Sequence, residues 1–182
     1  MTPQEQLTTS ALQALVQDGT LAGSWTLDPG RSQVQLETRH TWGLRPLHGV
    51  FGQVTGNGTV TAAGQVTGTF TVAAGSIDTK NKMRDKDLRS AKLFDIASHP
   101  DITYTVDDMQ PASGGVRVTG RLTVRGHTRP LAFDARVSAT KDEVRLDAEV
   151  PVNRAEFGLT YNPMRMTSMN NTIIVHAVFT RR

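Results

Sequence analysis

Strict alternation of apolar and polar residues runs through most of this chain and limits what it can fold into. In residues 115–125, GVRVTGRLTVR, arginines and threonines alternate with apolar side chains at Val116, Val118, Leu122 and Val124. Successive side chains of a β-strand point to opposite faces of its sheet, so this pattern predicts a strand with one buried and one solvated face. Such half-buried strands are typical of antiparallel sheets.

The same period of two recurs along the chain. Other apolar faces are Val34/Leu36, Val66/Phe70/Val72, Ile102/Tyr104/Val106, Leu131/Phe133/Ala135/Val137 and Val144/Leu146/Ala148/Val150, and the runs HGVFGQV and TIIVHAVFT add further strands. Turn signals such as DPG, NG, SGG and KDE separate them. About eight strands with one apolar face each predict an all-β sandwich or closed barrel. A barrel of that size is filled by side chains or holds one slender ligand.

The first residues have a different, helical pattern. Thr2, Pro3 and Glu5 form a helix-start signature, and Gly19 can end a helix over residues 2–18. The apolar stripe of this helix needs a partner surface, either on the outside or across one end of the domain, or at a subunit contact that would make a homodimer. The stripe consists of Leu7, Ala11, Leu12, Leu15 and Val16. We therefore divide the chain into a helical extension, 1–22, and a β-domain, 23–182.

Positive charge is concentrated in one segment. Residues 80–92 contain six basic and two acidic residues, although the whole chain has a net charge of only +3. The segment is either a solvated helix face or an attractive surface for phosphate or anionic lipid, including transient contact with an anionic membrane. Its surroundings provide one aromatic residue, Phe94, which argues against nucleic acid as a partner.

Signatures of catalytic and metal sites are missing from the sequence. The chain has no Cys and no HExxH, GxSxG or P-loop motif, so we expect no catalytic residues and no metal ligands. His40 and His176 follow apolar strand faces, and either could line a lumen as a neutral hydrogen-bonding group. An alternative hypothesis is an enzyme acting on a small amphiphile, with His40, His176 or the pair Arg84/Asp85 as the acid–base group.

The methionine-rich segment YNPMRMTSMNN allows two interpretations. Met164, Met166 and Met169 could bind a soft metal with His176 nearby, but methionines more often fill irregular apolar space. We favour lining or packing.

Export signals are also lacking at the start of the sequence. A basic n-region followed by a long apolar run is missing, and the run ALQALV is broken by Gln13. We expect a cytoplasmic location.

Five blocks of the sequence together resemble the YceI-like family of polyisoprenoid-binding, lipocalin-like proteins. They are WTLDPGRSQVQLETRH, HGVFGQVTG, SIDTKNKMRDKDLRSAKLFDIASHPDITY, GRLTVRGHTRPLAFDARV and VNRAEFGLTYN. The last contains one of the family's motifs, at Arg154, Phe157 and Gly158. The chain departs from the family at Arg31, where a His is common, in the helical pattern over residues 2–18 where family members usually have an export signal, and in its methionine-rich segment.

The resemblance implies an eight-stranded antiparallel barrel with a short helix in a long crossover, in addition to the N-terminal helix. It also implies an apolar lumen that binds an isoprenoid lipid of the polyprenyl phosphate or quinone type, with no catalytic residues and no required cofactor. We expect the ligand to contact Val34, Leu36, His40, Phe51, Phe70, Ile77, Met83, Arg84, Leu88, Phe94, Tyr104, Phe133, Phe157, Met164, Met166 and His176.

The charged segment then becomes a lid over the lumen. Thr79 or Asn81 would cap its helix, and Asp85 would pair with Arg89 four residues later. Met83 is expected to turn inward. Asp78, Arg84 and Asp85 are expected to form a hydrogen-bonded scaffold, or alternatively to meet the ligand's head group.

Overall fold

The computed structural model describes residues 9–40 and 44–182, except for the side chains of Thr9, His40 and Arg45. The predicted helix start at Thr2, Pro3 and Glu5 lies outside the described residues. The strands are β1 (Gly23–Leu27), β2 (Gln33–His40), β3 (Arg45–Phe51), β4 (Val54–Val60), β5 (Val66–Ala73), β6 (Ile77–Asp78), β7 (Asp101–Ala112), β8 (Gly115–Val124), β9 (His127–Ala139), β10 (Glu143–Asn153) and β11 (Asn170–Arg181).

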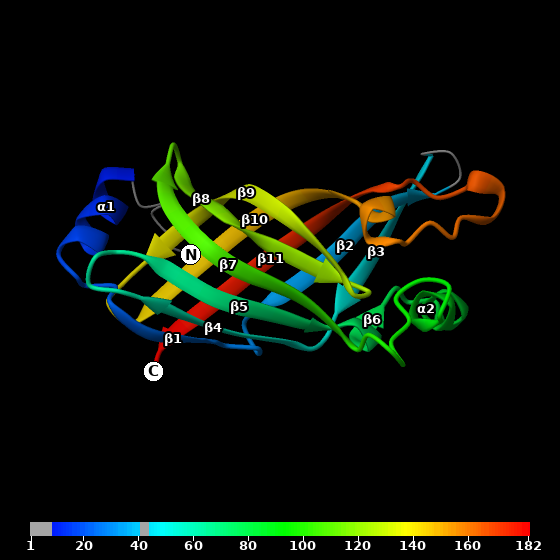
Figure 1. The fold of residues 1–182 in the computed structure, drawn as a ribbon, viewed down its shortest axis with the longest axis horizontal. Coiled ribbons are helices and arrows are strands. Elements are labelled where there is room, and N and C mark those ends of the chain that lie inside the picture. The colour runs from blue at the N-terminus through cyan, green and yellow to red at the C-terminus, as the bar shows by residue number, and fades with distance from the viewer. Residues whose placement is uncertain (1–8, 41–43) are drawn as a thin grey trace.

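The strands form one antiparallel sheet that closes into a barrel. The order β1-β4-β5-β7-β8-β9-β10-β11 becomes a ring because β11 also pairs with β1. Strands β2, β3 and β6 lengthen this ring at one end: β2 pairs with the first half of β11, β3 with β2, and β6 with β3. The predicted eight-stranded barrel is confirmed. Its wall is elongated because three of the eight positions in the ring are each occupied by two successive strands, namely β1 and β2, β3 and β4, and β5 and β6 (Figure 1).

Helix α1 (Thr9–Gln17) covers one end of this barrel (Figure 1). Leu12 is buried, and Leu15 and Val16 pack with it against the core cluster around Trp25. Gly19 follows the helix with φ of +76°, a left-handed conformation that glycine adopts at low cost, and ends it as predicted. The described part of the apolar stripe therefore packs across one end of the barrel of the same chain, which is one of the arrangements that the sequence predicted.

An arginine near the C-terminus fastens the segment that follows α1. Arg181 donates hydrogen bonds to the carbonyls of Thr20 (2.6 Å) and Ala22 (2.8 Å), and its guanidinium lies 4.6 Å from the Trp25 ring centre. Trp25 in turn donates from Nε1 to the Leu21 carbonyl. These contacts join the two ends of the described chain at the end of the barrel that α1 covers.

Helix α2 (Lys82–Arg89) lies at the opposite end, in the connection between β6 and β7 (Figure 1). Asn81 is its N-cap, because its side-chain oxygen accepts from the backbone N–H groups of Met83 and Arg84. The predicted Asp85–Arg89 pair is wrong. The Asp85 carboxylate accepts hydrogen bonds from Thr79, which directly follows β6, while Arg89 donates to the backbone carbonyls of residues 75 and 77.

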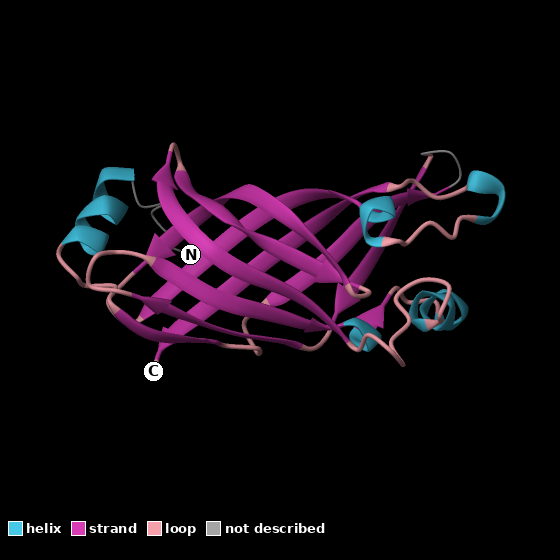
Figure 2. Cartoon of the chain, viewed as in Figure 1, coloured by secondary structure: helices cyan, strands magenta, loops and turns pink. Residues whose placement is uncertain are grey.

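Three short 3₁₀ turns complete the fold: η1 (Ala74–Ser76), η2 (Arg154–Phe157) and η3 (Pro163–Arg165). Figure 2 shows that helical segments gather at the two ends of the barrel, while its wall consists of strands. The described residues include no helix that is long and apolar enough to span a bilayer.

Buried apolar residues form two clusters. One contains Leu12, Trp25 and Val118 and occupies the end covered by α1, while the other contains Phe51, Ile77 and Phe94 and lies toward α2. We call these ends of the barrel the closed end and the open end.

Candidate functional site: an apolar cavity in the barrel

A cavity of about 400 Å³ lies inside the barrel, and its lining runs from Val118 of the cluster at the closed end to Arg84 and Leu88 of α2 at the open end. Its volume falls within the range of about 300–1,000 Å³ that is typical of small-molecule pockets. The lining includes these predicted residues: Val34, Leu36, Phe51, Phe70, Arg84, Leu88, Phe94, Tyr104, Phe133 and Phe157. Sequence alternation therefore placed many of the inward side chains on the correct face.

The cavity wall changes from apolar to polar along its length. From the closed end to its middle it is lined by aliphatic and aromatic side chains such as Val118, Leu122 and Leu146. Polar lining residues collect where α2 and the segment 159–169 meet the barrel, and they include Thr79, Arg84, Asp87, Arg154 and Asn171. An elongated molecule with an apolar body and a polar end matches this gradient.

Arg154 is a half-buried cation in the lining. Its guanidinium donates to the carbonyls of Leu159 (2.9 Å), Tyr161 (3.2 Å) and Ser168 (3.2 Å). No carboxylate among the described residues pairs with it, and its burial lowers the pKa of the guanidinium. Arg154 therefore fixes the course of segment 159–169 and brings positive charge to the cavity wall.

The three residues of the predicted scaffold, Asp78, Arg84 and Asp85, form no hydrogen bond or ion pair with one another and have three different roles. Asp85 is buried and accepts from the backbone N–H (2.9 Å) and hydroxyl (2.6 Å) of Thr79, which ties α2 to the barrel. Asp78 pairs with Lys80 at 2.8 Å, an exposed contact. The Arg84 side chain lines the cavity and has no described hydrogen-bond partner, so it is the member of the trio that is available to a ligand.

Tyr104 is part of the cavity lining. Its hydroxyl donates to the Leu131 carbonyl at 2.9 Å, and its ring lies 5.4 Å from that of Phe133. Strand β8 has Gly120 at the position that the ring covers, and a Cβ there would collide with the Tyr104 ring. Burial raises the pKa of Tyr104 to about 12, with a smaller contribution from Asp107.

Several predicted contact residues lie elsewhere. His176 is exposed and binds Asp147 at 2.6 Å, because the inward residues of β11 are Ile173, Val175, Ala177 and Phe179. The expectation that His176 faces the lumen is wrong. The His40 side chain lies outside the described residues.

The expected inward turn of Met83 is also wrong, since it is 77% exposed on α2. Met164 is 80% exposed, and neither it nor the half-buried Met166 is part of the cavity lining. Ile77 is fully buried in the core behind the lining. Within the described part of the chain, no group of three His, Cys, Asp or Glu side chains is arranged to hold a metal ion.

Other lining residues were missing from the expected set. Val72, Val106, Val124 and Val150 belong to apolar faces that the alternation had identified, so the signal was present. The inward residues of β11 carried no such signal, because residues 173–175 and 177–179 are apolar on both faces of the strand. The sequence indicated Arg154 as a motif residue that helps to fix the loop before Phe157, and gave no sign that it lines the cavity.

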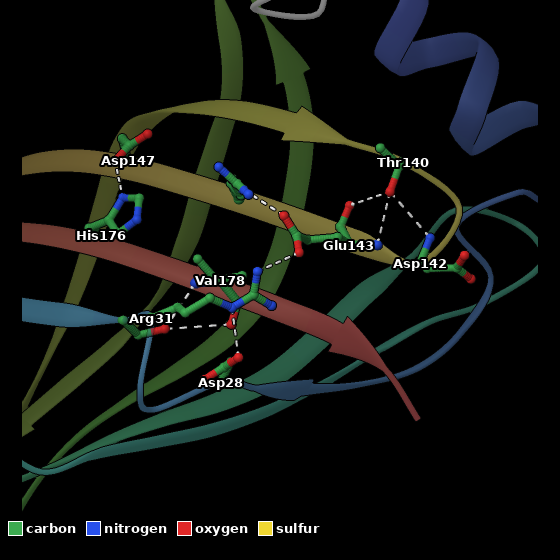
Figure 3. A network of polar contacts seen from close by, with 10 residues as sticks. Asp28, Arg31, Thr140, Asp142, Glu143, Asp147, His176 and Val178 are labelled. Atoms are coloured by element: carbon green, nitrogen blue, oxygen red, sulfur yellow. Dashed lines mark hydrogen bonds and ion pairs between the residues drawn. The ribbon is translucent and has the colours of Figure 1, made fainter. Parts of the chain in front are cut away.

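Polar residues on the outside of the barrel bridge the interruption between β1 and β2 (Figure 3). Asp28 donates its N–H to the Val178 carbonyl, and the Ser32 hydroxyl accepts from the Val178 N–H, so hydrogen bonding to β11 continues across the break. Arg31 binds both Asp28 and Glu143 at 2.7 Å, and these hydrogen bonds lower the pKa of both carboxyls. Arg31 thus has a structural role on the outer wall.

Comparison with solved structures shows the same architecture. Over 84% of this chain and 98% of the other, the barrel superposes on BcnA of Burkholderia cenocepacia with a TM-score of 0.75 and 21% sequence identity. A polyisoprenoid binding domain from Saccharophagus degradans gives a TM-score of 0.70 at 15% identity, over 87% of this chain and 98% of that domain. These similarities concern the fold.

Sequence comparison identifies more direct relatives. A UPF0312 protein of Pectobacterium atrosepticum is 30% identical over 96 residues, and the protein YceI of Salmonella arizonae is 29% identical over 96 residues. The matched region spans about half the length of this chain and of each of these relatives. The family model of the YceI-like domain matches residues 25–180, nearly the whole barrel. The chain belongs to the YceI-like domain family.

Proposed function

We propose that this protein binds one isoprenoid or similar amphiphilic lipid in the barrel and carries or sequesters it without chemical change. The observation that supports this most directly is the cavity of about 400 Å³, apolar in its middle and polar at the open end. The homologous fold of a domain described as polyisoprenoid binding agrees with this assignment.

Burial of an isoprenoid chain would supply enough free energy for binding. Each buried CH₂ group contributes about 0.8 kcal/mol, so a five-carbon isoprene unit contributes on the order of 3 kcal/mol. Micromolar affinity corresponds to about 8 kcal/mol. A few buried units therefore suffice, even after the entropy lost on binding reduces the total.

The polar end of such a ligand would lie near Arg84 and Arg154. Both line the cavity, and neither has a carboxylate partner among the described residues. A guanidinium can bind a phosphate with two parallel hydrogen bonds, and it can also donate to a quinone carbonyl. Arg84 is the better candidate for direct contact, since the Arg154 donors already serve backbone carbonyls.

Extraction and rebinding would test this function. The purified protein is extracted with organic solvent and the extract analysed by mass spectrometry, and the stripped protein is then titrated with an isoprenoid quinone, a polyprenyl phosphate and a saturated fatty acid. We expect a co-purified lipid and at least micromolar binding of an isoprenoid. Repeated preparations without lipid, together with no binding of any of the three, would rule the function out.

A blocking variant makes the test specific for the cavity. Leu122→Trp places an indole on the inward face of β8, and Thr119→Trp places the same group on the outward, exposed face of the same strand. The first should abolish binding and the second should leave it intact, with both variants folded by circular dichroism. Equal binding by the two variants would place the ligand outside the cavity.

A further inference from the structure

Large exposed apolar side chains gather at the open end of the barrel. Among the described residues, those identified as exposed large hydrophobics are Leu44 (79% exposed), Met83 (77%), Met164 (80%) and Tyr161 (42%). Leu44 directly precedes β3, Met83 lies on α2, and Tyr161 and Met164 lie in the segment 159–169. Figure 1 shows these three elements at the end of the barrel opposite α1. Single exposed apolar residues are ordinary, but their collection on one rim marks an interaction surface.

Positive charge accompanies these apolar side chains. Lys82 and Lys86 are exposed on α2, Lys92 follows the helix, and Arg165 is exposed next to Met164. No carboxylate among the described residues pairs with the three lysines, and Lys92 lies 5.0 Å from the Tyr161 ring centre. The exposed carboxylates of α2 and of the turn η2, which precedes the segment 159–169, are Asp87 and Glu156. Cations therefore outnumber carboxylates on this rim.

The closed end lacks such exposed apolar side chains among the described residues, and its lysine, Lys141, lies 3.9 Å from the Asp142 carboxylate. Helix α1 carries no charged residue in its first or last turn, and the apolar side chains Leu12 and Leu21 are buried there. Among the described residues, the combination of exposed methionines with unpaired lysines is thus found only at the end where the cavity has its polar lining. A basic surface with protruding apolar side chains suits the interface of an anionic bilayer, where the lysines meet lipid phosphates and the apolar side chains enter the acyl boundary.

We propose that the open end of the barrel is a docking face for anionic lipid membranes, with α2 and the segment 159–169 in contact with the head groups. This inference goes beyond ligand binding and does not depend on what the cavity holds. In such an orientation, the polar end of the cavity faces the bilayer, so a lipid could pass between membrane and barrel with little exposure of its apolar chain to water.

Flotation with lipid vesicles tests the docking face. The full chain is mixed with vesicles of phosphatidylcholine alone, or with 30% phosphatidylglycerol, at low and high salt. We expect binding to the anionic vesicles at low salt, weak binding to neutral vesicles, and loss of binding at high salt because exposed charges are screened. Equal binding to both vesicle types, or no binding to either, would overturn the proposal.

Charge-reversal variants locate the contact. Lys82→Glu with Lys86→Glu should weaken binding to anionic vesicles by at least ~30-fold, because each basic residue near an anionic surface contributes roughly fivefold. Lys141→Glu is the matched control, since its side chain is 80% exposed in the turn between β9 and β10, away from α2. If the α2 variant and the control bind equally, the open end is not the docking face.

Two further variants test whether the exposed methionines contribute to membrane binding and whether membrane binding is independent of the cavity. Met83→Ser with Met164→Ser should weaken binding several-fold without changing the salt dependence, and unchanged affinity would remove the apolar part of the proposal. The cavity-blocked Leu122→Trp variant should still float with the vesicles, because its substitution lies inside the barrel. Binding to polyglutamate without binding to anionic vesicles would reassign this face to acidic proteins and overturn the membrane assignment.

Discussion

Replacement of Arg154 should loosen the open end of the barrel. The guanidinium makes three hydrogen bonds to carbonyls of the segment 159–169, and bonds from a charged donor contribute about 1.5–3 kcal/mol each. Their sum is reduced because some of these carbonyls can regain water and because removal of Arg154 also relieves the desolvation of a half-buried cation. We expect Arg154→Met to lower the free energy of unfolding by about 3 kcal/mol.

Urea denaturation measures this loss, and amide hydrogen exchange shows where it occurs. Exchange should accelerate in residues 159–169 before the rest of the barrel opens, since the lost bonds all end there. Arg154→Lys should recover about half of the stability, because an ammonium cannot reach three carbonyls in the planar arrangement of a guanidinium. Arg136→Met, an exposed arginine on β9, is the control and should cost less than ~0.5 kcal/mol. An Arg154→Met variant as stable as the control, with unchanged exchange in 159–169, would refute this reasoning.

Three more predictions concern the elements around the cavity. Asp85→Ala should lower the free energy of unfolding by about 2–4 kcal/mol in urea denaturation, because two donors of Thr79 lose their acceptor in a buried site. A decrease below ~1 kcal/mol would contradict the role of Asp85 in holding α2 to the barrel. The pKa of Tyr104 is about 12 in the folded protein and near 10 in the unfolded chain, so the free energy of unfolding should fall as pH rises from about 10 to about 12. Ultraviolet titration and denaturation at several pH values check this. Tyr104→Phe should remove that component of the pH dependence. Deletion of residues 1–20 should red-shift the fluorescence of Trp25 and leave the number of subunits unchanged by light scattering, whereas a change from two subunits to one would show that the helix forms a dimer.

Much of the barrel could be predicted from local sequence because its strands have one apolar and one polar face. On β8, Val118, Leu122 and Val124 alternate with arginines and threonines, and they line the cavity. A period of two assigns each such side chain to a face without knowledge of the neighbouring strands. Asn81 was likewise recognisable as a helix cap, since its bonds reach only two and three residues along the chain.

Strand β11 shows where local sequence stops being sufficient. Residues 173–175 and 177–179 are apolar on both faces, so a shift of one residue leaves the pattern almost unchanged. Pairing with β10 decides the matter: His176 lies opposite Asp147, and both side chains point outward. The orientation of His176 depends on a residue 29 positions away in the chain.

The sequence by itself determined the class of fold, the approximate number of strands around the barrel, the helix in the charged segment and most of the inward strand faces. Each of these follows from short-range periodicity or from a motif. Tertiary structure decided that Met83 and Met164 face solvent beside Lys82 and Lys86, and that Arg154 holds the segment 159–169. It also decided that α1 covers the closed end. These features depend on contacts between distant parts of the chain, which decide whether a given side chain is buried or exposed and which groups it binds. A local sequence pattern does not contain that information.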